Sequence, residues 1–440
     1  MTTNSESQVS SAAVFVLGCK VNQAEAAGMR QMLEDVGCRI CGPDEPADIV
    51  IVNTCCVTSK AEAKSRRLVN RLSRLYPRAL VLVTGCLAEV NPASFDGSDG
   101  RILIYPQSQR AKLKRELEKR SLSSEWTGTQ QFTGEFVDFG VPSTPTKARE
   151  FMKIQDGCSS NCSYCIVPQA RGPERSLDAH SVLAHIEKME ESGVAEIVLT
   201  GVNLGAYGKD LAPKVNLEWL LRTALSRQAR VRFRLSSLEP EHITLSIVEL
   251  MAENDRLCNH FHVPVQSGDD RVLRQMNRAY DVSFVRALVK HILTNIPDAC
   301  LGFDIIVGFP GETDEAFNRT VKLLQDCQPS YLHVFPFSAR PGTCAAKLPC
   351  KVPDHVIQNR VELLRELSSH LRQEFFKRCI GGAYSAVVES GPDPVTKELL
   401  VRTENYIPAY CPPTQQLLKE KRGTVELIEL KNGRVLAHAL

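Results

Sequence analysis

The stretch "KIQDGCSSNCSYC", residues 153 to 165, decides how the rest of the chain is interpreted. It ends a short apolar strand pattern and then places Cys158, Cys162 and Cys165 within eight positions of one another. Structural zinc sites usually close four protein ligands. Here the next candidate, His180, lies 15 residues beyond the last cysteine. Three thiolates at this tight spacing favour an iron–sulfur cluster with one iron free of protein, where a small molecule can bind.

The same stretch begins an alternation of strand and helix patterns from residue 150 to about 340. Six strands with five intervening helices predict an incomplete (β/α) barrel rather than the closed eight-stranded form. In such a barrel the active site lies at the carboxyl edge of the strands, and the three cysteines directly follow the first strand. The strands are expected at residues 150 to 155, 196 to 201, 231 to 237, 261 to 265, 300 to 308 and 331 to 337.

The first 120 residues contain a separate alternation of strands and helices. Apolar runs at 12 to 18, 48 to 54 and 79 to 85 predict a parallel α/β sheet. The carboxyl ends of parallel strands lie on one edge, and neighbouring strands are ~4.8 Å apart. Cysteines from three strand ends can therefore converge on one small object. The cysteines that follow the three runs are Cys19, then Cys55 and Cys56, and then Cys86.

The remaining segments predict connecting and terminal elements. Residues 107 to 120 predict a charged surface helix, and residues 121 to 149, rich in Ser, Thr, Gly and Pro, predict a linker. Residues 353 to 382 form one long helix pattern between a proline and a glycine pair. The strand-like runs beyond it predict a small all-β barrel. From residue 375 to the end this part has a charge of only +2, which is a weak signal for RNA binding.

Composition limits the classes of protein that fit. At 440 residues the chain is long enough for two or three domains, with 43% apolar and 24% charged residues. No apolar run approaches the ~18 residues of a membrane span, and the start "MTTNSESQVSS" lacks a signal sequence, so we expect a cytoplasmic protein. Sixteen cysteines in that compartment favour metal or redox chemistry over disulfides. The net charge of +2 neither requires nor excludes a nucleic-acid partner.

Several motifs together resemble the methylthiotransferases of the radical S-adenosylmethionine (SAM) superfamily. The C-x3-C-x2-C spacing, with Tyr164 before the last cysteine, resembles the superfamily as a whole. The narrower resemblance rests on motifs that cover nearly the whole chain. These are "LGCKVNQAE" (17 to 25), "VNTCCVT" (52 to 58), "VTGCLAE" (83 to 89), "KIQDGCSSNCSYCIVPQARGPERS" (153 to 176), "TGVNLGAYG" (200 to 208), "LSSLEP" (235 to 240), "HVPVQSGDDRVLRQMNR" (262 to 278) and "DIIVGFPGETDEAF" (304 to 317).

This resemblance implies a domain organisation and two [4Fe-4S] clusters. The expected domains are an N-terminal methylthiotransferase domain (1 to 120), a linker (121 to 149), a radical SAM domain (150 to 375) and a TRAM-like RNA-binding barrel (376 to 440). One cluster, on the catalytic Cys158, Cys162 and Cys165, binds and cleaves SAM. A second, on Cys19, Cys55 and Cys86, holds sulfur that one SAM methylates and that is delivered to a carbon activated by the radical from another. Cys56 remains an alternative to Cys55.

Other side chains are candidates to bind the cosubstrate SAM. They are Tyr164, Gly201, Asn203, Ser236 and Asp304. The turn that contains Gly201 and Asn203 is equally compatible with an ordinary strand-to-helix connection. Asp304 lies inside an expected barrel strand, either facing the lumen at the site or hydrogen-bonded in the core.

The resemblance also indicates a substrate. "LGCKVNQ" and "RTENYIPAY" (402 to 410) are most similar to the branch that transfers a methylthio group to C2 of N6-threonylcarbamoyladenosine at position 37 of tRNA. The alternatives are N6-isopentenyladenosine in tRNA, a ribosomal-protein aspartate, or a non-catalytic iron–sulfur or RNA-binding protein. Expected partners are tRNA and an electron donor such as flavodoxin or ferredoxin, with the protein a monomer away from membranes. Arg171 and Arg175 are expected either to contact tRNA phosphates or to be plain surface arginines.

Overall fold

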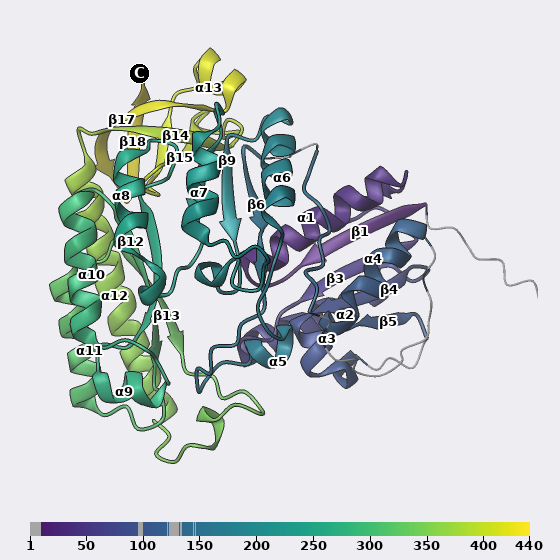
Figure 1. Cartoon of the computed structure of the whole chain (residues 1–440), viewed down its shortest axis with the longest axis horizontal. Helices are drawn as coiled ribbons and strands as arrows, with labels where there is room; N and C mark the ends of the chain where they lie inside the picture. The colour runs from purple at the N-terminus through teal and green to yellow at the C-terminus, as the bar shows by residue number, and fades with distance from the viewer. Residues whose placement is uncertain are drawn as a thin grey trace, which may run out of the picture.

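The N-terminal part of the computed structural model is a five-stranded parallel sheet flanked by helices (Figure 1). The structure describes residues 10–95, 100–120, 122, 132, 134–143, 145 and 147–440. The sheet order is β2-β1-β3-β4-β5, which confirms the predicted parallel α/β class. Its strands are β1 (Ser11–Val16), β2 (Arg39–Ile40), β3 (Ile49–Thr54), β4 (Leu80–Gly85) and β5 (Ile102–Tyr105). Its helices are α1 (Lys20–Asp35), α2 (Ser59–Leu75), α3 (Cys86–Val90) and α4 (Arg110–Lys119), with 3-10 turns η1 (Pro92–Phe95) and η2 (Gln107–Gln109).

The central part is an open parallel barrel made of two three-stranded sheets. A bridge between Ser237 and His262 of β11 joins the sheets, and a second bridge pairs Phe233 with Leu257, which precedes β11. The six strands confirm the predicted partial barrel. They are β6 (Arg149–Lys153), β9 (Glu196–Thr200), β10 (Arg232–Leu235), β11 (His260–Gln266), β12 (Cys300–Val307) and β13 (Tyr331–Pro336). A two-stranded ribbon, β7 (Gln155–Asp156) with β8 (Arg175–Ser176), lies on either side of the cysteine loop in sequence.

Helices cover the outside of the central barrel, and α10, α11 and α12 form one long flank in Figure 1. Apolar residues from these helices and the strands form the largest core of the protein. The helices are α5 (Val167–Arg171), α6 (Ala179–Glu191), α7 (Leu217–Ser226), α8 (Leu245–Glu253), α9 (Asp270–Gln275), α10 (Val282–Asn295), α11 (Asp314–Cys327) and α12 (Asp354–Cys379), with 3-10 turns η3 (Leu204–Ala206), η4 (Pro240–His242) and η5 (Ala345–Lys347). Among the described helices, none combines the length and hydropathy of a membrane span.

The C-terminal part is a closed five-stranded barrel, shown in yellow in Figure 1, as predicted. Its strand order is β14-β15-β16-β18-β17. The strands are β14 (Ala383–Ser390), β15 (Leu399–Thr403), β16 (Pro408–Cys411), β17 (Arg422–Lys431) and β18 (Arg434–Ala439), with α13 (Gln415–Glu420) before β17.

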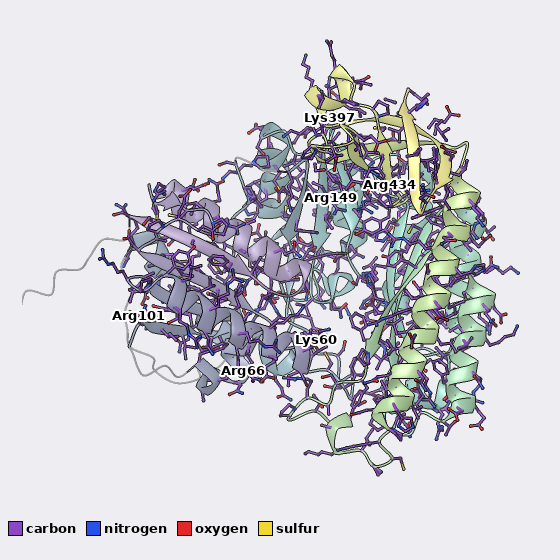
Figure 2. The ribbon with its side chains drawn as sticks, turned by 180° about the vertical axis from the view of Figure 1, so that it is seen from behind. Lys60, Arg66, Arg101, Arg149, Lys397 and Arg434 are labelled. Carbon is purple, nitrogen blue, oxygen red and sulfur yellow. The ribbon has the colours of Figure 1, made fainter. Side chains whose placement is uncertain are left out.

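Buried ionic contacts attach this terminal barrel to the amino ends of the central strands. Glu196 accepts hydrogen bonds from Arg232 at 2.8 Å and from Arg234 at 2.8 Å, and all three side chains are buried. The same arginines donate to backbone carbonyls of the terminal barrel strands and their connecting turn. Arg149 adds an ion pair to Glu389 at 2.9 Å, and Figure 2 shows Arg149 at this junction. The terminal barrel is therefore fixed by charged groups away from the cysteine loop.

The region that connects the N-terminal sheet to the central barrel differs in part from the prediction. The helix in residues 107 to 120 is present as α4, but it is not entirely a solvated face. Arg110 is 2% exposed and forms an ion pair with the buried Glu25 at 2.5 Å. The positive charge at this position therefore stabilises an internal carboxylate. Much of the expected linker, residues 121 to 149, lies outside the described residues.

Candidate iron–sulfur and cosubstrate site

The loop after β6 holds Cys158, Cys162 and Cys165, each partly buried. Gly157 begins this loop at φ +72°, and a β-carbon there would lie 1.8 Å from a backbone oxygen of Pro173. Any other residue at this position would collide with the chain that returns from the loop. A glycine before the first cysteine is therefore required by the shape of the loop.

Each of these three sulfur atoms accepts a hydrogen bond from a nitrogen donor. The backbone amide of Ser160 donates to Cys158 at 3.4 Å, and that of Val167 donates to Cys165 at 3.4 Å. The guanidinium of Arg278 donates to Cys162 at 3.1 Å. Such donors stabilise thiolates, the form of cysteine that binds iron. The donor set therefore fits a cluster held by three protein ligands.

Burial raises the pKa of two of these thiols. The pKa of Cys165 rises to about 12, mainly through desolvation, and desolvation also raises the pKa of Cys162. Metal binding requires deprotonated thiols, so it releases protons and compensates the cost of the buried negative charge. These sulfurs thus favour a bound cation over free thiolates.

In the N-terminal part, Cys19, Cys55 and Cys86 follow β1, β3 and β4 at the same edge of the sheet. Electrostatic interactions link all three pairs of these thiols. Cys19 is exposed, whereas Cys55 and Cys86 are each 3% exposed. Cys55 packs against Gly18, the residue before Cys19. A β-carbon on Gly18 would lie only 3.0 Å from the Cys55 sulfur. The structure therefore brings the predicted three cysteines together.

Cys56 occupies a different position from Cys55. It is fully buried in the core behind the sheet, where its thiol hydrogen-bonds to Cys86. That hydrogen bond, together with the nearby Arg171 guanidinium, lowers the pKa of Cys86 to about 6 against the effect of burial. Burial raises the pKa of Cys55 to about 12. Cys55 therefore interacts with both Cys19 and Cys86, whereas Cys56 is a hydrogen-bond donor to Cys86.

Arg171 connects the two cysteine sets and does not face solvent. It is 2% exposed, donates to the Cys86 sulfur at 3.3 Å, and forms ion pairs with Glu25 at 3.1 Å and Asp156 at 2.7 Å. Arg175 is 7% exposed and lies 3.7 Å from Asp156. Both sequence alternatives, a contact with tRNA phosphates and a plain surface position, are therefore wrong for these arginines. The two arginines instead compensate the negative charge of the buried carboxylates Glu25 and Asp156.

A cavity of about 210 Å³ is bordered by the central cysteine loop and by the segment that follows Cys56. Cys165, Tyr164 and Asp304 line one side, and Val57 and Thr58, which follow Cys56, line the other. Desolvation raises the pKa of Tyr164, so its hydroxyl stays protonated. Two of the five predicted cosubstrate residues, Tyr164 and Asp304, therefore share one cavity with a cysteine of the central loop.

Asp304 combines the two roles that the sequence left open. It lines the cavity and also accepts hydrogen bonds from His262 at 2.6 Å and His333 at 3.1 Å. Burial alone would raise its pKa, but the two imidazoles outweigh that effect and lower the pKa to about 2. His262 is itself held by Ser237 at 2.9 Å. Asp304 is therefore a fixed carboxylate at neutral pH.

The other three predicted cosubstrate residues do not line this cavity. A β-carbon on Gly201 would lie 2.8 Å from the Gln155 side chain, whose oxygen accepts the amide of Asn203 at 2.8 Å. The side-chain oxygens of Asn203 and Ser236 are buried and have no hydrogen-bond partner among the described residues. Two orphaned acceptors at the carboxyl ends of β9 and β10 fit a bound ligand with polar hydrogens.

Sequence reasoning missed several side chains of this site. Arg278 contacts Cys162 and pairs with Glu239, and its position at the end of the motif at 262 to 278 gives no sign of this contact. His262 and His333 were missed because 71 residues separate them and only the β11-β12-β13 order brings them together. The sequence signal that could have identified them is the presence of a histidine within an apolar strand pattern.

Comparison with known proteins agrees with this arrangement. Residues 152–324 match the radical SAM superfamily, and residues 11–103 match a family described as uncharacterized protein family UPF0004. The first match contains the central cysteine loop and implies SAM and a [4Fe-4S] cluster. The second contains the three N-terminal cysteines.

Relatives with established names extend over nearly the whole chain. The threonylcarbamoyladenosine tRNA methylthiotransferase MtaB of Treponema pallidum is 34% identical over 90% of this chain and 93% of its own length. The tRNA-2-methylthio-N(6)-dimethylallyladenosine synthase of Pelotomaculum thermopropionicum is 32% identical, with coverage of 86% and 87%. The radical SAM methyltransferase TsrM of Kitasatospora setae shares the fold, with a TM-score of 0.55, 14% identity and coverage of 76% and 77%. The chain belongs to the radical S-adenosylmethionine methylthiotransferase family.

Proposed function

We propose that this protein transfers a methylthio group to C2 of N6-threonylcarbamoyladenosine at position 37 of tRNA. The observation that carries the proposal is the single cavity lined both by Cys165 and by the segment after Cys55 and Cys56. A substrate base in this cavity lies between the place where a radical forms and the place where sulfur is held. The MtaB relatives of Treponema pallidum and Bacillus subtilis, at 34% and 33% identity, carry this activity in their names.

Each cysteine set has one role in this proposal. Cys158, Cys162 and Cys165 hold a [4Fe-4S] cluster, and Cys19, Cys55 and Cys86 hold a second one. When bound, the clusters and two equivalents of SAM supply a 5′-deoxyadenosyl radical and a methylated sulfur. Tyr164, Asp304, Gly201, Asn203 and Ser236 bind the cosubstrate. In support, Asn203 and Ser236 each present a buried oxygen with no partner among the described residues.

Lys20 supports the threonylcarbamoyl substrate over the isopentenylated one. It is the first residue of α1, directly after Cys19, and is half-buried. Its ammonium forms no hydrogen bond or ion pair with any described residue. Tyr406 is its first electrostatic neighbour, followed by Arg149 and Arg234 and then by Asp304 of the cavity. A threonylcarbamoyl group carries a carboxylate, which can pair with this ammonium, whereas an isopentenyl group is apolar.

The partners and the domain assignment belong to the same proposal. tRNA is the substrate, a flavodoxin or ferredoxin supplies electrons, and the enzyme acts as a cytoplasmic monomer. The N-terminal domain comprises residues 1 to 120, the linker 121 to 149, the radical SAM domain 150 to 375 and the TRAM-like domain 376 to 440.

Iron content and cosubstrate cleavage test the two-cluster assignment. After anaerobic reconstitution we expect about eight irons per chain, because each of two clusters holds four. The Cys19→Ala, Cys55→Ala, Cys86→Ala triple variant should lose about half of the iron and all product while still cleaving SAM. Cys56→Ala is the matched control and should keep its iron. Zinc in place of iron, or no SAM cleavage after reduction, would falsify the assignment.

Nucleoside mass spectrometry of tRNA tests the substrate. A strain that lacks this protein should lose 2-methylthio-N6-threonylcarbamoyladenosine and regain it when the gene is restored. Loss of the methylthio group from the isopentenylated base instead would overturn the choice of substrate and leave the two-cluster assignment intact.

A further inference from the structure

A row of aromatic side chains leads from the terminal barrel to the cavity. Tyr331, His333 and Phe335 alternate along β13, so all three lie on one face of this edge strand. Ring centroids are 5.1 Å apart between Tyr331 and His333 and 6.3 Å apart between His333 and Phe335. Tyr406 of the terminal barrel continues the row, 6.1 Å from Tyr331. We call these four side chains the aromatic row.

The aromatic row is most accessible at His333 and Phe335, whereas His260 stacks against the Tyr406 ring at 4.3 Å. The His333 side chain is 49% exposed, Phe335 is 41% exposed, and Tyr331 and Tyr406 are half-buried. Phe335 lines the cavity beside Cys165. The other three members line a second cavity of about 290 Å³. His333 therefore lies where the second cavity approaches Asp304 of the first.

The charged residues that line the second cavity are positive. Arg372 and Arg402 line the second cavity, and no described residue that lines it is acidic. Arg402 is paired with Glu389 at 2.6 Å, but the exposed Arg372 has no ion pair with any described residue and lies over the Phe376 ring. Planar rings beside an unpaired cation suit a ligand with flat faces and negative charge. Single-stranded RNA has both, since bases stack on aromatic side chains and phosphates pair with arginine.

We propose that the aromatic row and Arg372 bind the unpaired nucleotides next to the modified base of the substrate RNA. This inference rests on the proposed function, because it requires an RNA substrate whose reacting base enters the cavity beside Cys165. Bases on either side of that position then stack along β13 toward the terminal barrel. Affinity for the RNA comes from the central barrel as well as from the weakly charged terminal barrel.

Binding of a labelled anticodon stem–loop RNA to the reconstituted full-length protein tests the proposal. Phe335→Leu keeps apolar bulk but removes the stacking face, so the affinity should fall roughly tenfold or more. Phe335→Tyr should keep the wild-type affinity. Phe284→Leu on α10 is the matched control, because Phe284 is also 41% exposed and lies off the aromatic row. It should bind as the wild type does.

Salt dependence tests the arginine separately. Arg372→Gln should lower the slope of log affinity against log salt by about 0.7, the value for one phosphate contact on a single strand. Arg365→Gln, an exposed position two turns earlier on α12, should leave the slope unchanged. Equal affinity of Phe335→Leu and Phe284→Leu, or an unchanged slope in Arg372→Gln, overturns the proposal, as does a wild-type protein that does not bind the RNA.

A second probe distinguishes this proposal from the choice of substrate. The same stem–loop with an isopentenylated base should show the same dependence on Phe335 and Arg372, since both contact neighbouring nucleotides. If only the isopentenylated RNA is thiomethylated while the variants still weaken binding, the substrate assignment fails and the aromatic row stands.

Discussion

Lys20 gives the sharpest prediction for a single residue. If its ammonium pairs with the substrate carboxylate, Lys20→Gln should raise KM for the threonylcarbamoyl RNA about tenfold or more, because hydrogen bonds to charged groups contribute ~1.5–3 kcal/mol. Steady-state kinetics with anaerobically reconstituted enzyme measures this. Lys60→Gln is the control, since Lys60 on α2, labelled in Figure 2, is exposed. Unchanged KM in Lys20→Gln, with normal iron content, contradicts the pairing.

Arg278 gives a prediction about redox potential. Its hydrogen bond to Cys162 would stabilise the more negative, reduced form of a cluster held there, so Arg278→Gln should lower the cluster potential by on the order of 50–100 mV. Potentiometry followed by electron paramagnetic resonance measures the shift. Arg274→Gln, at an exposed position on α9, should leave the potential unchanged. An equal potential in both variants shows that Arg278 has no influence on the cluster.

At the level of secondary structure, Glu196 at the start of β9 is expected to stabilise the attachment of the terminal barrel to the central strands. Glu196→Gln leaves Arg232 and Arg234 buried with a neutral partner, which should cost ~3–5 kcal/mol at this junction. Hydrogen exchange of the β15 amides should accelerate accordingly. Glu187→Gln on α6 is the control, since its side chain is 66% exposed and its effect should stay within about 0.5 kcal/mol. Equal exchange rates in both variants contradict the role of the junction.

The strands that position the site were predictable, and many of its side-chain contacts were not. Apolar runs marked β1, β3 and β4, and the cysteine after each run marked the shared sheet edge. The two-residue strands β2, β7 and β8 are too short to leave a periodic pattern. Arginine near a loop suggests exposure, but Arg171 is buried against Asp156, 15 residues away, and Glu25, 146 residues away. Burial of charge follows from tertiary packing and not from local sequence.

For the whole molecule, one buried charge network joins the N-terminal sheet to the central barrel. Glu25 on α1 pairs with Lys153 at 3.1 Å and Arg171 at 3.1 Å, and Asp156 pairs with the same two cations. Because Arg171 also donates to Cys86, this network fixes the distance between the two cysteine sets. The same ion pairs therefore contribute both to the attachment of the N-terminal sheet and to the alignment of the two sets, together with the Arg340–Glu62 pair and the shared apolar core.

Because of this network, we expect the N-terminal sheet to separate from the central barrel in acid. Burial alone would raise the pKa values of Glu25 and Asp156, but the surrounding cations outweigh it and hold both below their ordinary values. The stabilisation is therefore complete above about pH 4.5, and it is lost as the pH falls through the ordinary carboxyl range toward the lower folded values. Small-angle scattering should show an increase in the radius of gyration over this range.

Glu25→Gln tests the cause of that transition. Removing the carboxylate leaves buried cations with fewer partners, so the N-terminal sheet should be destabilised by ~3–5 kcal/mol already at pH 7. The acid transition should become shallower, because one of the two titrating carboxyls is gone. Glu34→Gln, exposed on the same helix, should behave as the wild type. If Glu25→Gln and Glu34→Gln expand at the same pH and with the same steepness, this network does not hold the two parts together.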